Sequence, residues 1–154
     1  MNDLDAIRRV MGLYAQLLDD GRFDEWGQLF TEDAEWISLP GLYKPGATKP
    51  DAWIVRGRNE IVKQVSEATK GLCTPESRGM HFSGSPIIDV NGDKANVWCD
   101  FVIVHITPTK LETTATGRYY NKFEKTGGRW RFSQRVSAQQ GAELPAGLVA
   151  VPGA

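Results

Sequence analysis

Apolar residues recur every three or four positions near the start of the chain. The stripe consists of Leu4, Ile7, Val10, Met11, Tyr14, Leu17 and Leu18. Because this spacing follows the helical repeat, it predicts an amphipathic helix over residues 3–20. Asn2 is a suitable N-cap for this helix, and Gly21 is a suitable residue to end it.

Two further helices are predicted in the first half of the chain. The segment RFDEWGQLF (22–30) predicts a short helix, and residues 58–70 predict a longer one. Between them, AEWISL (34–39) predicts a strand, and the Pro- and Gly-rich segment PGLYKPGATKPDA (40–52) predicts a loop. GLCTPESRG (71–79) predicts a second loop before the pattern changes.

The second half of the chain has the pattern of strands. HFSGSPIIDV (81–90) and KANVWCDFVIVHI (94–106) flank an Asn-Gly pair, a strong hairpin signal. LETTATGRYYNKFEK (111–125) and RWRFSQRVSA (129–138) flank Thr-Gly-Gly in the same way. Helices followed by a strand meander predict an α+β fold, with three helices packed on one face of a strongly curved, mainly antiparallel sheet. Such a cone has an apolar interior that suits a small molecule.

Composition narrows the class of protein. The chain has 154 residues, 41% hydrophobic and 24% charged, with a net charge of −1. This length fits one domain, which we place at residues 1–140, with a tail at 141–154. A charge so near zero argues against nucleic acid or an acidic membrane as partner, and no long apolar run or secretory signal is present. We therefore expect a cytoplasmic protein.

The cysteines and histidines carry no metal or redox signature. Cys73 and Cys99 are far apart and are expected to be free thiols, Cys73 in a loop and Cys99 in a strand. His81 and His105 are 24 residues apart and have no carboxylate at ligand spacing, so we expect neither a metal site nor a cofactor.

His81 is the candidate catalytic base, because imidazole can accept a proton near neutral pH. A carboxylate beside it would fix its tautomer and stabilise the imidazolium, and Asp19 at the end of the first helix could do this. Tyr14 could point its hydroxyl into the same cavity. On an ideal helix Tyr14 and Asp19 are about 140° apart, so both reach one cavity only if the helix end bends or frays.

Other residues are candidates for the rest of the pocket. Arg135 alternates in phase with Arg129, Arg131 and Ser133, so the pattern favours an arginine facing solvent. It could hold an anion or a leaving group if the inner face accepts this phase. The candidate lining residues are Trp26, Phe30, Trp36, Trp53, Phe82 and Cys99.

The order of three segments resembles the SnoaL-like branch of the nuclear transport factor 2-like superfamily. These are YAQLLDDGRFDEWGQLFTEDAEW, MHFSGSPIIDVNGDKA and GRYYNKFEKTGGRWRFSQR, and the resemblance covers residues 3–140. Within this branch the chain is most similar to the γ-hexachlorocyclohexane dehydrochlorinases and bile acid 7α-dehydratases, and also resembles the scytalone dehydratases. The resemblance implies a cone-shaped α+β barrel that is commonly a homo-oligomer, with a trimer favoured over a dimer.

The resemblance also implies roles for individual residues. Asp19 and His81 match an Asp–His pair, and Arg135 matches a pocket arginine of the dehydrochlorinases. Tyr14 matches a tyrosine of the 7α-dehydratases, whereas the dehydrochlorinases have a lysine there, which disfavours chlorinated substrates. The positions of two ketosteroid isomerase carboxylates are held by Ser38 and Tyr119, which argues against that activity.

These observations predict a cofactor-free lyase of the dehydratase or dehydrohalogenase type. His81 would remove a proton from a small hydrophobic cyclic, polyketide-like or steroid-like substrate, with Asp19, Tyr14 and Arg135 assisting. Two alternatives stay open. The cone could be a non-catalytic binding protein for a hydrophobic ligand, or a cyclase or isomerase that uses the same pair.

Overall fold

The computed structural model describes residues 1–41 and 50–153. Its helices are α1 (Asp3–Asp19), α2 (Phe23–Gly27) and α3 (Arg58–Thr69), followed by the 3₁₀ helix η1 (Lys70–Leu72). Asn2 caps α1 as predicted, because its side chain accepts a hydrogen bond from the Asp5 backbone N–H at 2.9 Å. Gly21 follows the helix at φ 70°, a conformation that glycine adopts without strain. None of the described helices is long and apolar enough to cross a membrane.

Within the described residues, eight strands form one mixed sheet. They are β1 (Phe30–Leu39), β2 (Trp53–Arg56), β3 (Cys73–Thr74), β4 (Ser77–Ser83), β5 (Ile87–Asn91), β6 (Lys94–Thr107), β7 (Lys110–Thr126) and β8 (Arg129–Gln139). Their order is β2-β1-β8-β7-β6-β4-β3, and β5 pairs with β6. The pair β1–β8 is parallel and the other pairs are antiparallel. This confirms the predicted α+β fold.

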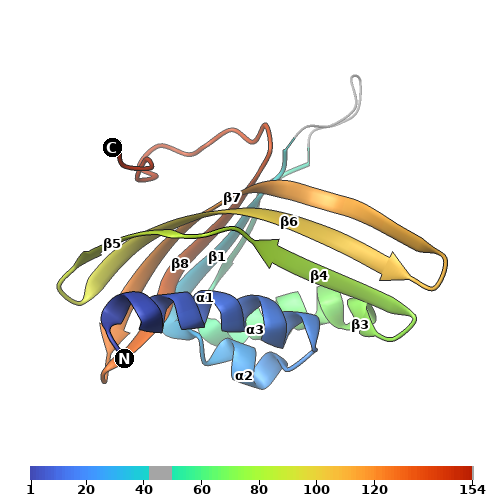
Figure 1. Cartoon of the computed structure of the whole chain (residues 1–154), viewed down its shortest axis with the longest axis horizontal. Helices are drawn as coiled ribbons and strands as arrows, with labels where there is room; N and C mark the ends of the chain where they lie inside the picture. Colours follow the sequence, from blue (N-terminus) through green and yellow to red (C-terminus); the bar gives the residue numbers. More distant parts are fainter. Residues whose placement is uncertain (42–49, 154) are drawn as a thin grey trace.

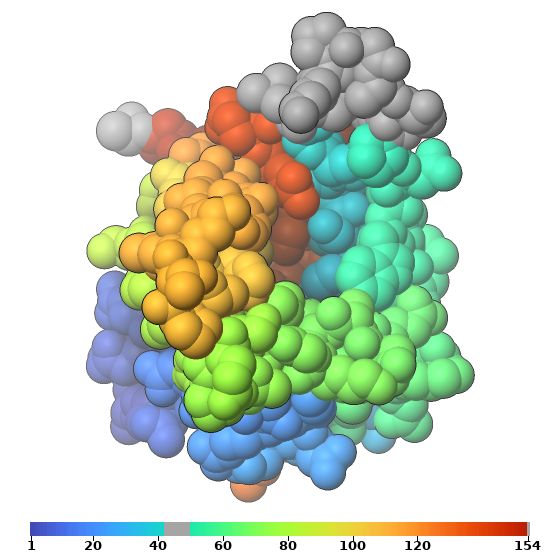
Figure 2. Space-filling model, turned by 90° about the vertical axis from the view of Figure 1, so that its right-hand side faces the viewer, coloured from blue at the N-terminus to red at the C-terminus, as the bar shows by residue number. Residues whose placement is uncertain are grey.

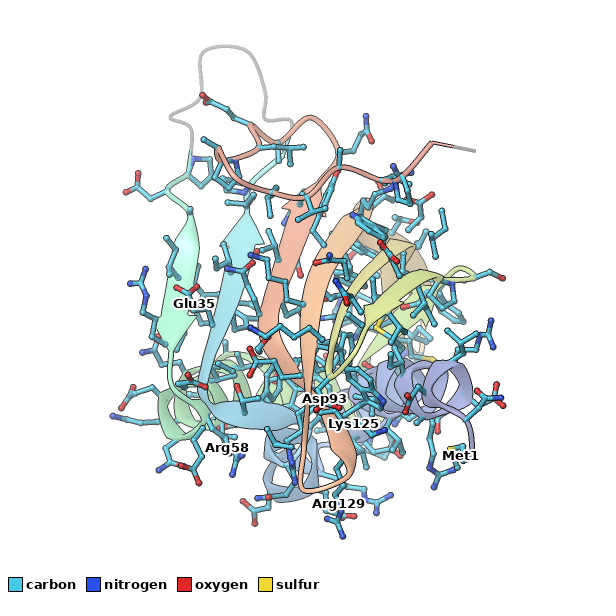
Figure 3. The ribbon with its side chains drawn as sticks, turned by 90° about the vertical axis from the view of Figure 1, so that its left-hand side faces the viewer. Met1, Glu35, Arg58, Asp93, Lys125 and Arg129 are labelled. Atoms are coloured by element: carbon cyan, nitrogen blue, oxygen red, sulfur yellow. The ribbon has the colours of Figure 1, made fainter. Side chains whose placement is uncertain are left out.

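The sheet curves strongly over the helices. Figure 1 shows the long strands β6 and β7 arching above α1, α2 and α3, which all lie on the concave side. The narrow end is closed where the β7–β8 hairpin meets the start of α1. There Lys125 Nζ and Trp130 Nε1 both lie within 2.9 Å of Asp3 Oδ1. Figure 3 shows Lys125 at this end, near Asp93 and on the side of the helices.

The opposite end of the concave face is open. Figure 2 looks into it and shows a hollow between the orange β7 and the blue-green β1 and β2, with the red β8 visible deep inside. The segment after β8 runs back over the convex face instead of covering this opening (Figure 1). Ala142 and Leu148 of this segment pack on Leu39 and Val136, and the carbonyl of Val149 accepts a hydrogen bond from Trp98 Nε1 at 2.9 Å.

The boundaries differ from the prediction in several places. The predicted helix 22–30 ends at Gly27, and the strand predicted at 34–39 begins at Phe30. The edge strand β2 was not predicted, because its four residues are too few to show a periodicity. The predicted loop 40–52 precedes it, and most of that loop lies outside the described residues. The predicted strand 81–90 is two strands, because Gly84–Pro86 separates β4 from β5. The predicted loop 71–79 contains the end of η1, β3 and the start of β4.

Candidate active site

His81 and Asp19 form a close pair at the junction of α1 and β4. His81 Nδ1 lies 2.6 Å from Asp19 Oδ1, and the backbone N–H of His81 donates to Oδ2 at 2.9 Å. Both side chains are largely buried, with 17% of His81 and 7% of Asp19 exposed. These two hydrogen bonds explain why a carboxylate is tolerated at the negative end of the helix dipole.

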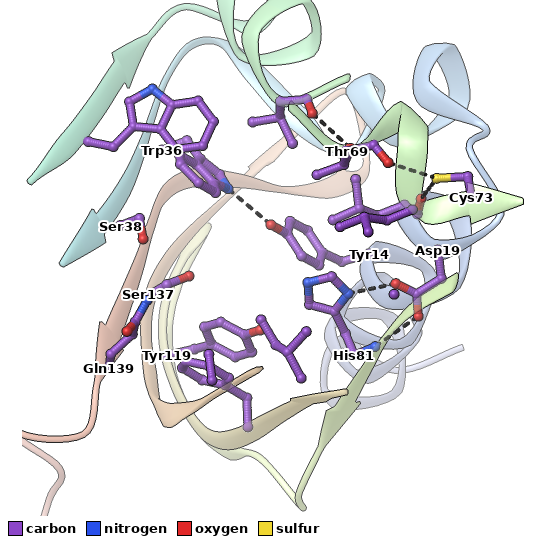
Figure 4. Close-up of a pocket in the computed structure, with 18 residues that line it drawn as sticks. Tyr14, Asp19, Trp36, Ser38, Thr69, Cys73, His81, Tyr119, Ser137 and Gln139 are labelled. Atoms are coloured by element: carbon purple, nitrogen blue, oxygen red, sulfur yellow. Dashed lines mark hydrogen bonds and ion pairs between the residues drawn. The ribbon is translucent and has the colours of Figure 1, made fainter. Parts of the chain in front are cut away.

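The carboxylate determines which ring nitrogen of His81 can act as a base. A carboxylate accepts hydrogen bonds, so the bond to Asp19 places the hydrogen of a neutral imidazole on Nδ1. The lone pair is then on Nε2, on the side of the ring away from Asp19. Figure 4 shows the His81 ring directed into the cavity, with Asp19 behind it. This arrangement can accept a proton from a molecule in the cavity and stabilise the resulting positive charge.

The adjacent aspartate has a different environment. Asp20 points to the surface, where its Oδ1 pairs with Arg78 Nη2 at 2.6 Å. Regular helical structure continues through Asp19, so Tyr14 and Asp19 both border the cavity without a break in the helix. The expectation that the helix must bend or fray was wrong, because the cavity extends around the end of α1.

The cavity has a volume of about 210 Å³ and is mainly apolar. The residues on its walls are Tyr14, Leu18, Asp19, Trp36, Ser38, Trp53, Val65, Thr69, Leu72, Cys73, Gly79, His81, Phe101, Ile103, Ala115, Tyr119, Ser137 and Gln139. Tyr14 Oη accepts a hydrogen bond from Trp36 Nε1 at 3.0 Å, which leaves the phenol hydrogen available to a ligand. Trp36 and Trp53 pack edge to face, with ring centroids 4.8 Å apart.

Arg135 does not face solvent, and this corrects the phase read from the sequence. A bulge at Ser133 shifts the β7–β8 register, since Lys122 pairs with Gln134 while Phe123 pairs with Phe132. The extra residue turns Arg135 to the concave face, where it is 1% exposed.

Arg135 lies behind the cavity wall and is not on it. Its guanidinium carbon is 3.5 Å from the ring centroid of Tyr14 and 3.7 Å from that of Tyr119, so the two rings enclose the cation. Nη1 donates to Asn121 Oδ1 at 3.1 Å, and Nε has no partner among the described residues. Burial raises the pKa of the Tyr119 phenol, and the nearby Arg135 charge opposes this shift only in part.

The other predicted lining residues divide into two groups. Trp36 and Trp53 are on the wall, whereas Trp26 and Phe30 are fully buried in the core beneath it, in contact with each other at 4.8 Å between ring centroids. Phe82 lies on the convex face and is 52% exposed, because it is next to the inward-facing His81 on β4.

Cys99 lies in a strand as expected, but Cys73 takes the place on the cavity wall that was predicted for Cys99. Cys99 is buried off the cavity wall, with its Sγ 2.9 Å from the Gly84 carbonyl oxygen. Cys73 is a cavity residue that the sequence reading placed in a loop. Burial, with the charge of Asp19, raises the pKa of the Cys73 thiol, which disfavours a nucleophilic thiolate.

His105 is partnered outside the cavity. Its Nε2 is 2.9 Å from Ser77 Oγ, and its Nδ1 is 3.8 Å from Glu112 Oε1. Across residues 1–41 and 50–153, no three histidine, cysteine, aspartate or glutamate side chains come together in a group that could hold a metal ion.

Comparison with known proteins identifies the family of the chain. The family model of the SnoaL-like domain matches residues 1–136. The chain belongs to the SnoaL-like domain family. Two curated relatives are the β1 and β2 subunits of the terminal oxygenase component of terephthalate 1,2-dioxygenase from Comamonas sp., each 23% identical over 80% of this chain and 82% of its own length.

Solved structures share the fold of this SnoaL-like chain. A protein of unknown function from Mycobacterium tuberculosis has a TM-score of 0.73 and 21% identity, over 97% of this chain and 78% of that chain. A protein assigned as a scytalone dehydratase, from Novosphingobium aromaticivorans, has a TM-score of 0.70 and 24% identity, over 96% of this chain and 95% of that chain. Since these identities are low, the likeness concerns the fold, which is known to carry different activities.

Proposed function

We propose that this SnoaL-like protein is a cofactor-free lyase that eliminates water or halide from a small hydrophobic cyclic substrate. The observation that supports this most is the Asp19–His81 pair, held by two hydrogen bonds at the wall of an apolar cavity. A base that is oriented in a mainly apolar site is suited to remove a proton from carbon.

The reaction begins with transfer of a proton from a substrate carbon to His81 Nε2. The electron pair of that C–H bond forms a C=C bond to the neighbouring carbon, and the bond from this carbon to the leaving group breaks. A hydroxide leaving group takes up a proton to become water, and His81 can return the one it removed. A halide leaves as the anion, and the proton passes from His81 to solvent. Asp19 stabilises the imidazolium between these steps.

Tyr14 and Arg135 support the charge that develops on oxygen. The Tyr14 hydroxyl is free to donate to a carbonyl or to the leaving oxygen, because its own acceptor site is filled by Trp36. Arg135 acts through the rings of Tyr14 and Tyr119 as a positioning residue, since it does not reach the cavity. We expect Arg135→Met to lower turnover, roughly 10- to 100-fold, by analogy with the loss of other electrostatic groups. Unchanged turnover in a folded variant would remove Arg135 from this scheme.

The volume of the cavity limits the substrate. About 210 Å³ is below the range of roughly 300–1,000 Å³ typical of drug-sized ligands. It suits a compound of one or two rings, and a steroid would have to extend through the mouth.

The test uses a two-ring substrate with either leaving group. 3-Hydroxyindan-1-one and 3-chloroindan-1-one both give inden-1-one by loss of the C2 proton and the C3 substituent. Product formation by chromatography and mass spectrometry should be faster with the protein than in buffer, and His81→Ala should remove the difference. An isomeric product with no loss of water or chloride would indicate an isomerase. Catalysis that survives His81→Ala would contradict the proposed base.

A non-catalytic role is the second candidate. It is favoured by the two curated relatives, which are β subunits of an oxygenase component. In that case the cavity binds a hydrophobic ligand or is an incidental feature of an assembly module. Ligand affinity would then survive in His81→Ala, and no compound of the elimination type would be turned over.

We further propose a homo-oligomer, with a trimer favoured by the resemblance to the dehydratases. On the convex face, Phe82, Val102 and Leu111 are 52%, 38% and 70% exposed, and Phe82 and Val102 are cross-strand neighbours. A second copy of the chain would bury this surface. Sedimentation should report a trimer at micromolar concentration, and Phe82→Ser should weaken it. A monomeric wild type would contradict the proposal.

The location proposed for the protein is the cytoplasm. Cys73 and Cys99 are both free, as is usual in a reducing compartment.

A further inference from the structure

Two groups of polar side chains lie at opposite ends of the cavity. His81 and Asp19 form one end, and Ser38, Ser137 and Gln139 form the other. Figure 4 shows the second group across the cavity from His81. In sheet order, β1 is four strands from β4, about 19 Å along the sheet at roughly 4.8 Å per strand. The curvature turns these distant strands to face each other across the hollow.

The strand register explains how the second group is assembled. Ser38 and Ser137 are direct neighbours on the parallel strands β1 and β8, and Ser137 is also opposite Tyr119 on β7. After the bulge at Ser133, residues 135, 137 and 139 of β8 all face inward. Along β8 toward the mouth, the inward side chains are thus the buried guanidinium of Arg135, the hydroxyl of Ser137 and the amide of Gln139.

These side chains are available to a ligand. Ser38, Ser137 and Gln139 are half-buried, and their side-chain polar atoms have no hydrogen-bond partner among the described residues. Half-buried hydroxyl and amide groups that the protein leaves unpaired gain most from a ligand that pairs with them. The walls between the two ends are mainly apolar, with Val65, Phe101, Ile103 and Ala115, and the Tyr14 hydroxyl beside Trp36 is assigned above to the reacting end of the substrate.

The charge of the wall limits the class of this ligand group. Among the described lining residues there is no lysine or arginine, and the acidic side chain is that of Asp19. A carboxylate or phosphate on the ligand would be desolvated here without a cation in contact with it, since Arg135 lies behind the rings of Tyr14 and Tyr119. Serine hydroxyls and an amide can both donate and accept, which fits a neutral hydroxyl or carbonyl.

We infer that Ser38, Ser137 and Gln139 form a polar subsite for a neutral hydroxyl or carbonyl group at the end of the substrate remote from the reacting carbon. This inference rests on the proposed function in one respect, namely that the reacting carbon lies at the His81 end. It makes the ligand a compact molecule with an apolar ring body and a polar group at each end.

Three indanones that differ only at the remote ring position test the subsite. They are indan-1-one, 5-hydroxyindan-1-one and 1-oxoindane-5-carboxylate, with affinities measured by isothermal titration calorimetry. We expect the hydroxy compound to bind about tenfold more tightly than indan-1-one, as two modest hydrogen bonds would give. The carboxylate should bind no more tightly than indan-1-one.

The variants separate this subsite from a general effect on the cavity. In the double variant Ser38→Ala with Ser137→Ala, the advantage of the hydroxy compound should fall below about twofold, while the affinity for indan-1-one stays the same. Ser133→Ala is the matched control, because Ser133 is on the same strand but not on the cavity wall. Gln139→Leu should remove part of the advantage, and Gln140→Ala at the neighbouring exposed position should not.

The result is independent of turnover. His81→Ala should keep the full preference for the hydroxy compound, so a failure of the elimination chemistry leaves this inference standing. The inference is overturned if the hydroxy compound binds no more tightly than indan-1-one, including the case in which neither binds. It is equally overturned if the double variant keeps the preference or if the carboxylate binds most tightly.

Discussion

The concave face of the sheet is filled at one end and hollow at the other. At the filled end, Phe132 lies 5.4 Å from Phe30 and 4.3 Å from Phe123 between ring centroids, and Trp26 covers Phe30 at 4.8 Å. At the hollow end the inward positions of the same strands carry smaller side chains, among them Ser38, Ser137 and Ala115. The backbone curvature is shared, so the difference in side-chain volume produces the cavity.

Between the two ends lies a row that forms the floor of the cavity. Trp36 pairs with Arg135 across β1 and β8, and Arg135 pairs with Asn121 across β8 and β7. This row is the boundary between the packed core and the cavity. Trp36 of the row and the neighbouring Tyr14 both contact the core and line the cavity. Dense packing and the candidate site therefore lie at different places along the same strands, so their contributions to stability and to chemistry can be tested separately.

The largest expected effect is at the hollow end. His81→Ala should lower the rate of elimination by roughly 10²–10⁴-fold, because it removes the base. The free energy of unfolding should change far less than the rate. Initial rates with 3-hydroxyindan-1-one and urea unfolding measure the two quantities. His105→Ala is the matched control, and an equal loss of rate in that variant would indicate a structural effect.

The next effect is at the filled end. Phe132→Ala should reduce the free energy of unfolding by about 3–5 kcal/mol, as expected for a large ring removed from a packed core. Ser137→Ala, further along the same strand, should change it by less than about 0.5 kcal/mol, as is usual away from packed side chains. Urea unfolding followed by circular dichroism compares them. Similar losses in the two variants would mean that both ends contribute alike to stability.

Filling the hollow should affect binding more than stability. Ala115→Leu places three more carbon atoms into the cavity, so the Kd for indan-1-one should rise at least about tenfold. The free energy of unfolding should change by no more than about 1.5 kcal/mol, since the added volume enters open space. Calorimetry measures the affinity, with Ala146→Leu on the exposed tail as control. Undiminished affinity would show that indan-1-one binds elsewhere.

The smallest effect concerns Tyr119, which stacks on Arg135 of the floor, and it depends on pH. Burial raises the pKa of Tyr119, so the folded protein keeps the phenol neutral. As pH rises through the ordinary tyrosine value of about 10, the phenol ionises in the unfolded chain but not in the folded one, and the free energy of unfolding falls. Between pH 10 and 11 the wild type should lose about 1 kcal/mol more than Tyr119→Phe. Unfolding curves at the two pH values give the difference. Parallel losses in both proteins would contradict a buried neutral phenol.

Much of the fold could be predicted because its local signals agree. The stripe of α1 and the two Gly-containing hairpins give the helix and the meander. The pair Asp19–His81 was proposed from the chemistry of the residues and from the family resemblance, and the structure places the two side chains in contact.

What the sequence could not show depends on register and on tertiary position. The bulge at Ser133 turns Arg135 from the convex to the concave face of the sheet. The sequence of this segment contains no residue type that predicts a bulge. The facing of Ser38 and Ser137 depends on the parallel pairing of β1 with β8, strands nearly 100 residues apart in sequence. Phe82 was expected inside because it is aromatic, but the alternation along β4 sends it outward when His81 faces in.

The central claim is that His81, held by Asp19, takes a proton from carbon inside the cavity. Exchange of the C2 protons of indan-1-one with D₂O, followed by proton NMR, tests this without any leaving group. The wild type should exchange these protons faster than buffer does, His81→Ala should reduce the rate to that of buffer, and Asp19→Asn should retain only a small part of it. Exchange that is unaffected by His81→Ala, or no acceleration although indan-1-one binds, would contradict the claim.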